Sequence, residues 1–186
     1  MIIVLDTETT GFHPEDGDEL LQVSIIEDNA EVLFNSYVRP EHHTEWKDAM
    51  KVNQITPEMV ADAPTISEVR EELSKIINSA DIIIGYNTPF DLRFLDYCAD
   101  IRPAPGQKII DTMQDVKNVF GFCKWVKLVE AAKIFGFDFA MHELRAHDSL
   151  ADVYATLHVH RCLNYLEILR DQEEEWRLRH AEQSTD

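Results

Sequence analysis

The sequence predicts an α/β domain built on a mixed five-stranded sheet, with an antiparallel hairpin and with helices on both faces. Apolar runs of strand length come first along the chain, and from Thr65 onward strands alternate with helical periods. Asp28-Asn29 supplies turn chemistry between two of the early runs, which is typical of a hairpin. The later alternation of strands and helices favours parallel pairing in the rest of the sheet.

The five expected strands are short apolar runs that end at polar or turn residues. The first run ends at Asp6, and the fourth is rich in isoleucine. The predicted strand ranges are 2–5, 20–27, 31–38, 81–86 and 108–110.

Capping signals place the helices. Thr65-Ile-Ser-Glu68 has the spacing of a capping box and opens an amphipathic helix. Pro89 suits the first turn of the next helix, and Gly136 suits a helix end. The expected helix ranges are 66–79, 89–100, from 112 onward, 127–135, and from 147 past 170, with one or two short helices within 39–64.

A chain of 186 residues suits one domain, which we assign to residues 1–170, followed by a polar C-terminal tail at 171–186. Because 45% of the residues are hydrophobic, a disordered chain is excluded. No apolar run approaches the roughly 18 residues of a membrane span, and the apolar start has no basic region before Asp6, so we expect neither a membrane segment nor a signal peptide. Three scattered cysteines predict a reducing, cytoplasmic environment.

The charge of the chain is strongly negative and uneven. Its 17 basic and 35 acidic side chains give a net charge of −18, which excludes broad electrostatic capture of nucleic acid and predicts weak salt dependence. An enzyme that holds a short strand through divalent ions is not excluded, because such ions invert the local field. Residues 1–38 hold nine carboxylates and no lysine or arginine, whereas residues 108–133 hold five lysines. That second segment is either a surface for phosphate or a solvated helix face.

Asp6 and Glu8 are the first candidate pair. Two residues apart on an extended chain, they point to one face, at the strand end where open α/β sheets bind ligands. Close like charges share a proton or bind a cation, and hard oxygen ligands suit Mg²⁺ or Mn²⁺. The alternative is two exposed acids. Thr9-Thr10-Gly11 follows, as a turn or as a close backbone approach to a phosphate or sugar.

Asp91 is the second candidate. It lies in the first turn of a helix, where the helix dipole favours any carboxylate, so capping is one explanation. Its neighbours Phe90, Leu92 and Phe94 are apolar, and an acid in such a context usually has a partner.

His147 and Asp152 are the third candidate. The same His-x4-Asp spacing occurs at His13 and at His43, where we expect plain surface residues. Five residues on a regular helix span about 140° around its axis, so the two side chains converge only if His147 precedes the helix. Asp148 is expected to offset the dipole of the first turn.

Together the motifs Asp6-Thr-Glu8-Thr-Thr-Gly11, Asn87-x-x-Phe90-Asp91 and His147-x4-Asp152 resemble those of the DEDDh family of 3′–5′ exonucleases. This group includes the proofreading subunit of bacterial replicative polymerase, ribonuclease T and the TREX enzymes. The resemblance covers roughly residues 1–165. It implies a ribonuclease-H-like fold and stepwise 3′→5′ release of nucleoside monophosphates with two divalent cations, Mg²⁺ or Mn²⁺.

The resemblance also implies roles for the matching residues. Asp6 would contact both ions, Glu8 and Asp152 the ion nearer the attacking water, and Asp91 the second ion. His147 would be the general base, since a neutral imidazole can take a proton near pH 7. Four residues are expected to line the substrate pocket: Thr9, Thr10, Phe12 and Asn87. Phe12 would stack on the terminal base, unless it packs on the core.

Two departures from the family pattern bear on substrate rather than on activity. Gln22-Val-Ser24 stands where many relatives have Glu-Ile-Gly, and Tyr86 precedes Asn87 where many have His. Thr9 stands where oligoribonucleases typically have Met, which favours DNA as the substrate. The alternatives are a 3′–5′ exoribonuclease that trims RNA, and a non-catalytic nuclease-like module that docks onto a replication or repair assembly.

The expected partners are nucleic acid with a free 3′ end and a polymerase or repair assembly, but no membrane. The last helix has apolar residues late in its course, and these pack either on the chain's own sheet or on a partner such as a second copy in a homodimer. They are Leu163, Leu166, Leu169 and Trp176.

Overall fold

The computed structural model describes residues 1–121, 123–140 and 144–181. Its sheet has five strands in the order β3-β2-β1-β4-β5. The central strand β1 pairs antiparallel with β2 and parallel with β4, while β3 and β5 form the edges. The strands are β1 (Ile2–Thr9), β2 (Leu20–Glu27), β3 (Val32–Tyr37), β4 (Ile82–Gly85) and β5 (Lys108–Asp111). The predicted α/β class, hairpin and mixed sheet are confirmed.

Seven α-helices and one short 3₁₀ helix are present in the described residues. They are η1 (Pro14–Asp16), α1 (Lys47–Asn53), α2 (Pro57–Val60), α3 (Ile66–Ser79), α4 (Thr88–Ala99), α5 (Thr112–Phe120), α6 (Leu128–Ile134) and α7 (Ser149–Ala181). The capping box predicted at Thr65 forms, with the Thr65 backbone N–H donating to the Glu68 carboxylate at 2.7 Å. Gly136 has a positive φ of 78° just after α6, as a helix end requires.

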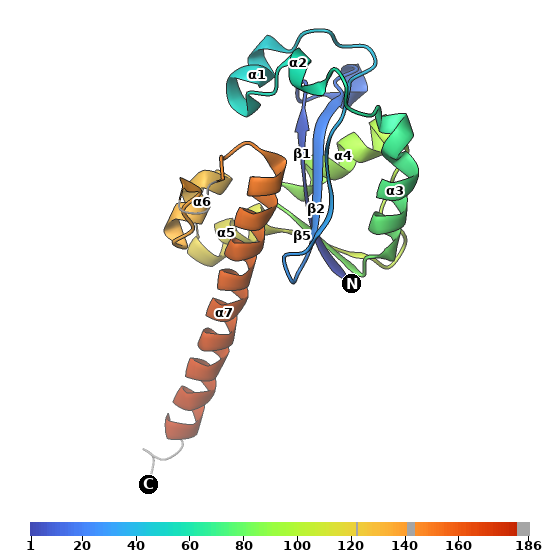
Figure 1. Ribbon diagram of the computed structural model, residues 1–186. Helices are drawn as coiled ribbons and strands as arrows, with labels where there is room; N and C mark the ends of the chain where they lie inside the picture. The colour runs from blue at the N-terminus through green and yellow to red at the C-terminus, as the bar shows by residue number, and fades with distance from the viewer. Residues whose placement is uncertain (122, 141–143, 182–186) are drawn as a thin grey trace.

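Helices cover both faces of the sheet, because successive side chains of a strand point to opposite sides. Ile3 and Leu5 of β1 pack against α3 and α4, whereas Val4 between them packs against Val153 and Leu157 of α7. Figure 1 shows α3 and α4 on one side of the sheet, and α5, α6 and α7 on the other. Even-numbered residues of β1 therefore face α7.

Two element ends differ from the sequence prediction. β1 continues through Thr9, so Asp6 and Glu8 lie within the strand. α7 continues to Ala181 and projects beyond the body of the domain, so residues 171–181, which were predicted as a tail, are helical (Figure 1). The ion pair of Arg177 with Glu173, 2.6 Å apart at i,i+4 spacing, supports this part of the helix, in which Trp176 and Leu178 are exposed. The rest of the predicted tail, 182–186, lies outside the described residues.

No helix among the described residues has the length and apolar character needed to cross a membrane. Cys98, Cys123 and Cys162 are free thiols.

Candidate active site

β1 presents two carboxylates to one face of the sheet. Asp6 and Glu8 alternate with Thr7 along the strand, so both point to the α7 side, and Asp6 pairs with Ser24 of β2. The register shifts between Glu8 and Thr9, where β1 leaves the regular ladder. Thr9 still pairs with Leu20 beyond this irregularity, so the acidic pair lies within the sheet, next to the end of β1.

Asp91 meets β1 from α4. Its side chain is only 2% exposed, and its Oδ1 accepts hydrogen bonds from the Thr7 backbone N–H at 3.0 Å and the Thr7 hydroxyl at 2.7 Å. Dipole compensation alone would leave a first-turn carboxylate at the surface, whereas this one is buried against the strand that carries Asp6 and Glu8.

His147 precedes α7, as convergence with Asp152 requires. Its backbone has a positive φ of 62°, and its N–H donates to both carboxylate oxygens of Asp152 at 3.3 Å. Asp148 caps the helix start by accepting the N–H of Leu150 at 3.1 Å, in agreement with its expected role. The tight turn before α7 therefore brings the imidazole and the Asp152 carboxylate to the same place.

The three motifs converge. One ligand atom from each of Glu8, His147 and Asp152 lies within 4.8 Å of the others, although their elements are far apart in sequence. The charges of Asp91, Asp152 and Glu8 all act on Asp6, which places its carboxylate in the same cluster. Carboxylates gathered in this way fit hard divalent cations, because the oxygens are the ligands such ions prefer. The geometry would also allow His147 to act as a ligand.

Burial raises the pKa of every carboxyl group in this cluster, and repulsion among the carboxylates adds to it at Asp6 and Glu8. Burial raises the pKa of Asp6 well above its ordinary value, and the neighbouring carboxylates raise it further. Burial and the charge of Asp152 raise the pKa of Glu8 to about 8, against a hydrogen bond from Asn53 that lowers it. Burial raises the pKa of Asp91 to about 7 and that of Asp152 to about 7. Either protons or cations relieve such a cluster, so the site is suited to bind metal ions near neutral pH.

The pKa of His147 moves in the opposite direction. Partial burial lowers it, and the positive charge of Lys127 lowers it further. A histidine with a lowered pKa is neutral at pH 7 and has a free lone pair with which to accept a proton.

The loop that follows β1 is braced by its own side chains. The Thr9 hydroxyl donates to the Gly11 carbonyl at 2.6 Å, and the Thr10 hydroxyl accepts the Glu19 N–H at 2.8 Å. A Cβ on Gly11 would lie 2.2 Å from the Asp18 carboxylate, so only glycine fits there without a shift. The hydroxyls of Thr9 and Thr10, two residues expected to line the substrate pocket, thus shape the loop.

Phe12 and Asn87 are exposed beside the carboxylates. The Phe12 ring is 70% exposed and meets Phe90 edge-on, with ring centres 6.3 Å apart, while its carbonyl accepts a hydrogen bond from Arg93 at 2.7 Å. Packing on the core is therefore excluded for Phe12. Asn87 caps α4 with a positive φ of 68°, and its N–H donates to Asp111 at 2.8 Å.

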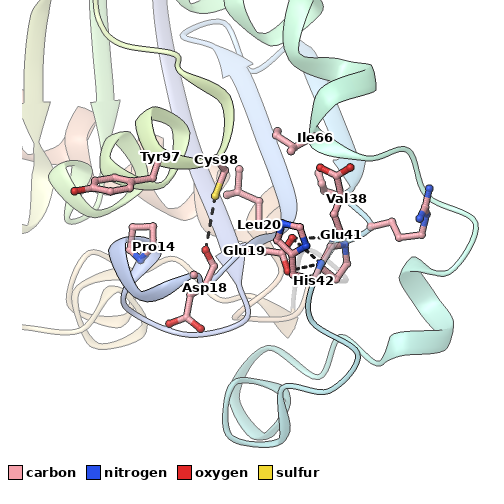
Figure 2. Close-up of a pocket in the computed structure, with 13 residues that line it drawn as sticks. Pro14, Asp18, Glu19, Leu20, Val38, Glu41, His42, Ile66, Tyr97 and Cys98 are labelled. Atoms are coloured by element: carbon pink, nitrogen blue, oxygen red, sulfur yellow. Dashed lines mark hydrogen bonds between the residues drawn. The ribbon is translucent and has the colours of Figure 1, made fainter.

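A separate cavity of about 200 Å³ lies between η1, β2, α4 and the segment after β3 (Figure 2). Glu19 in its wall accepts the backbone N–H groups of Glu41 at 2.6 Å and His43 at 2.8 Å, and Cys98 donates to the Asp18 carbonyl at 3.7 Å. These contacts hold the β1–β2 loop to its neighbours. The hydrogen bonds around this cavity support the loop after β1, and none of the clustered carboxylates lines it.

Sequence reasoning missed several polar residues that hold the site together. Asn53 is 2% exposed and donates to the Thr9 carbonyl at 3.2 Å, while Ser149 is buried with its hydroxyl 2.6 Å from that of Ser24. The Ser149 N–H also donates to the Gln22 side chain at 3.3 Å. The departure Gln22-Val-Ser24 therefore anchors the start of α7. The only sequence signal for this contact was the presence of polar Gln22 and Ser24 within an otherwise apolar strand.

The sheet order, the helices on both faces and the acidic cluster at the end of the central strand define a phosphodiester hydrolase of the exonuclease class. A family model described as Exonuclease (RNase_T) matches residues 3–160, and the chain belongs to this family. The DNA polymerase III subunit epsilon of Rickettsia felis is 30% identical over 160 residues, which cover 81% of this chain and 68% of that protein. The predicted 3′–5′ exonuclease is confirmed.

Solved structures support the predicted ribonuclease-H-like fold. Exonuclease X in complex with 5′ overhanging duplex DNA superposes with a TM-score of 0.62 at 21% identity, covering 88% of this chain and 90% of that one. Escherichia coli exonuclease I in complex with a dA16 oligonucleotide gives a TM-score of 0.69 at 20% identity, covering 95% of this chain and 45% of that one. At these identities the similarity concerns the fold alone.

Proposed function

We propose that this chain releases nucleoside monophosphates one at a time from the 3′ end of single-stranded DNA. The observation that carries the proposal is the convergence of Asp6, Glu8, Asp91 and Asp152 with His147 at one end of β1. Two observations favour DNA as the substrate. Relatives are named as a subunit of a DNA polymerase, and position 9 is Thr rather than Met.

The clustered carboxylates would hold two divalent cations, Mg²⁺ or Mn²⁺. Asp6, on which the charges of the other three act, would contact both ions, Glu8 and Asp152 would hold one of them, and Asp91 would hold the other. When bound, such a pair stabilises the attacking and the leaving oxygen of an in-line displacement. The raised pKa values of these groups support cation binding, because each cation replaces protons that the apo cluster retains.

His147 is the proposed general base. Its ring is exposed beside Glu8 and Asp152, and its lowered pKa keeps it neutral at pH 7, ready to take a proton from the attacking water. The hydrogen bonds from its backbone N–H to Asp152 fix the turn. The imidazole is thus held by the turn that precedes α7 and not by the helix itself.

The terminal nucleotide would lie between the loop after β1 and the start of α4. Phe12 offers an exposed ring for stacking on the terminal base, which tolerates any base. Asn87 offers an exposed amide at the start of α4, while Thr9 and Thr10 shape the loop backbone that faces the sugar and phosphate.

The test is a digestion ladder. Single-stranded DNA and RNA of matched sequence, each labelled at the 5′ end, are incubated with Mg²⁺, Mn²⁺ or EDTA. We expect a ladder that shortens by single nucleotides on DNA with either ion and none with EDTA. Faster shortening of RNA would favour the exoribonuclease instead, and Mn²⁺ binding without hydrolysis of either strand would favour the non-catalytic docking module.

Variants locate the activity in this site. Asp6→Ala and His147→Ala should each abolish release while the protein retains its thermal unfolding transition. Release at the rate of the unchanged protein from either variant would refute the site.

The relatives named as polymerase subunits support a polymerase or repair assembly as a protein partner, with nucleic acid as substrate. A homodimer through the late apolar residues of α7 stays a prediction: Leu169 and Trp176 are exposed, whereas Leu163 packs in the core of the domain itself. Sedimentation at increasing protein concentration would test it.

A further inference from the structure

The connection between α5 and α6 carries an exposed tryptophan among lysines. Trp125 is 53% exposed, and Lys117 Nζ lies 4.1 Å from the centre of its ring. Lys124 and Lys127 flank it in sequence, and both are exposed. We refer to Lys117, Lys124, Trp125 and Lys127 as the α5–α6 surface.

This composition differs from that of the whole chain. The net charge is −18, yet three lysines lie within residues 117–127, and one of them, Lys117, contacts the Trp125 ring. Positive charge with an exposed ring is the combination that binds single-stranded nucleic acid, because lysines attract phosphates and the ring stacks on bases. A solvated helix face would account for the lysines alone, whereas here Lys117 lies against the ring of an exposed tryptophan in the connection between two helices.

The α5–α6 surface is fixed next to the active site. The Tyr86 hydroxyl donates to the Val126 carbonyl at 2.7 Å, and Tyr86 immediately precedes Asn87, the N-cap of α4. Tyr86 and Val126 also pack in one cluster with Leu144, which lies three residues before His147. The connection is therefore tied to the start of the helix that holds Asp91 and to the segment that leads to His147.

Residues 1–38 supply β1 and the loop with Phe12, but they contain no lysine or arginine. Cations for the phosphates that follow the terminal one therefore belong to other parts of the chain: Arg93 contacts the Phe12 carbonyl, and the α5–α6 surface offers three lysines next to Tyr86.

We propose that the α5–α6 surface binds the nucleotides immediately 5′ of the terminal one, with Trp125 stacking on a base and Lys127 contacting a phosphate. The inference rests on the proposed function, because it requires a strand whose 3′ end lies at the carboxylates. It adds a second stacking position to that of Phe12 and makes the enzyme prefer strands longer than a dinucleotide.

The test measures kcat/KM on oligothymidylates of two, four and eight nucleotides. We expect kcat/KM of the unchanged protein to rise with length. Trp125→Leu should reduce this rise about tenfold, mainly through KM, because loss of one base stack is of that size. Trp125→Tyr should restore most of it, since tyrosine also stacks. Lys127→Gln should lower the slope of log kcat/KM against log salt by about 0.7, the value for one phosphate contact with a single strand.

Matched controls separate this effect from general changes of charge or ring. Lys75→Gln on α3 removes an exposed lysine, and Trp176→Leu on α7 removes an exposed tryptophan, so both should keep the length dependence of the unchanged protein. A kcat/KM that is independent of length, or a length dependence unchanged in both Trp125→Leu and Lys127→Gln, overturns the inference and leaves the proposed function standing. Failure of the unchanged protein to release nucleotide at any length overturns both.

Discussion

Thr7 holds Asp91 in place across 84 residues of sequence. One carboxylate oxygen of Asp91 accepts both the backbone N–H and the hydroxyl of Thr7, at 3.0 and 2.7 Å. Thr7 lies between Asp6 and Glu8 on β1, so the orientation of the α4 carboxylate is set by the strand that carries the other two acids. Thr7 is therefore a positioning residue for the cluster.

Thr7→Val should impair this positioning. The substitution keeps the shape and the backbone donor but removes the hydroxyl, so a buried carboxylate loses one of its hydrogen bonds. We expect a loss of about 1–3 kcal/mol in the free energy of unfolding and weaker Mn²⁺ binding, measured by denaturant titration and calorimetry. Thr7→Ser keeps the hydroxyl and serves as the control. Equal Mn²⁺ affinity in the valine and serine variants would show that the hydroxyl does not orient Asp91.

Asp6→Asn should stabilise the ion-free protein while it abolishes activity. Asp6 is repelled by Asp91, Asp152 and Glu8, and asparagine removes that repulsion at nearly constant volume. Each kcal/mol gained raises Tm by about 2–4 °C in a protein of this size. Thermal unfolding in EDTA measures the gain, with Asp62→Asn at an exposed position as the control. A lower Tm for Asp6→Asn would mean that its carboxylate is stabilising even without ions.

The ion-free protein should lose stability as pH rises from about 5 to 8. A carboxyl group has a pKa of about 4 in the unfolded chain, whereas the folded pKa is about 7 for Asp91 and Asp152 and about 8 for Glu8. A carboxyl group whose pKa is higher in the folded protein stabilises the fold fully below its unfolded pKa of about 4. This stabilisation is lost as the pH rises through the pKa of the folded protein. Unfolding at intermediate pH therefore releases protons.

Mn²⁺ should reverse this loss, and more strongly at pH 8 than at pH 5, because cations compete with protons for the same oxygens. Scanning calorimetry with Mn²⁺ or EDTA at several pH values measures both effects. Comparison with Asp6→Asn corrects for carboxylates elsewhere, such as Glu19, whose pKa is lowered by hydrogen bonds from His43 and its neighbours. A Tm in EDTA that increases steadily from pH 5 to 8 would contradict the prediction.

The sequence predicted the sheet and the Asp6–Glu8 pair because both follow from local patterns, whereas the approach of Asp91 and Asp152 to this pair was implied by the family resemblance. Isoleucine-rich runs set the strands, and period-two spacing placed Asp6 and Glu8 on one face. Local pattern alone was insufficient for the histidine motif: His13 also donates its N–H to an aspartate five residues on, Asp18, at 2.9 Å, yet this pair only braces a loop. What distinguishes His147 is Glu8 from a distant strand.

The supporting contacts were not predictable for the same reason. In the sequence Thr7 is an ordinary strand residue, and only the fold brings Asp91 against it. Asn53 likewise looks like a helix end, and only the fold brings its amide to the Thr9 carbonyl. The sequence predicted a last helix that continues past 170 but not that it reaches Ala181, because residues beyond 170 show no apolar period; the Arg177–Glu173 ion pair lies in that part of the helix.

Ser24 and Ser149 should be energetically coupled and should together position His147. Their hydroxyl oxygens are 2.6 Å apart, both side chains are fully buried, and Ser149 is the first residue of α7. The Ser24 hydroxyl also donates to Asn35 at 3.0 Å, so the shared proton comes from Ser149. Either serine replaced by alanine leaves a buried polar group with one partner fewer, which costs about 1–2 kcal/mol.

The double variant should cost less than the sum of the two single variants, by about 0.5–1 kcal/mol, because the second substitution removes a group that the first has already left without its partner. The single variants should also lower kcat while KM stays constant, since Ser149 lies between His147 and Asp152 and its contact with Ser24 holds this turn in place. Denaturant unfolding of the four proteins measures the coupling, and steady-state kinetics measures the positioning. Strictly additive costs together with an unchanged kcat would mean that the contact between the two hydroxyls neither stabilises the start of α7 nor orients the imidazole.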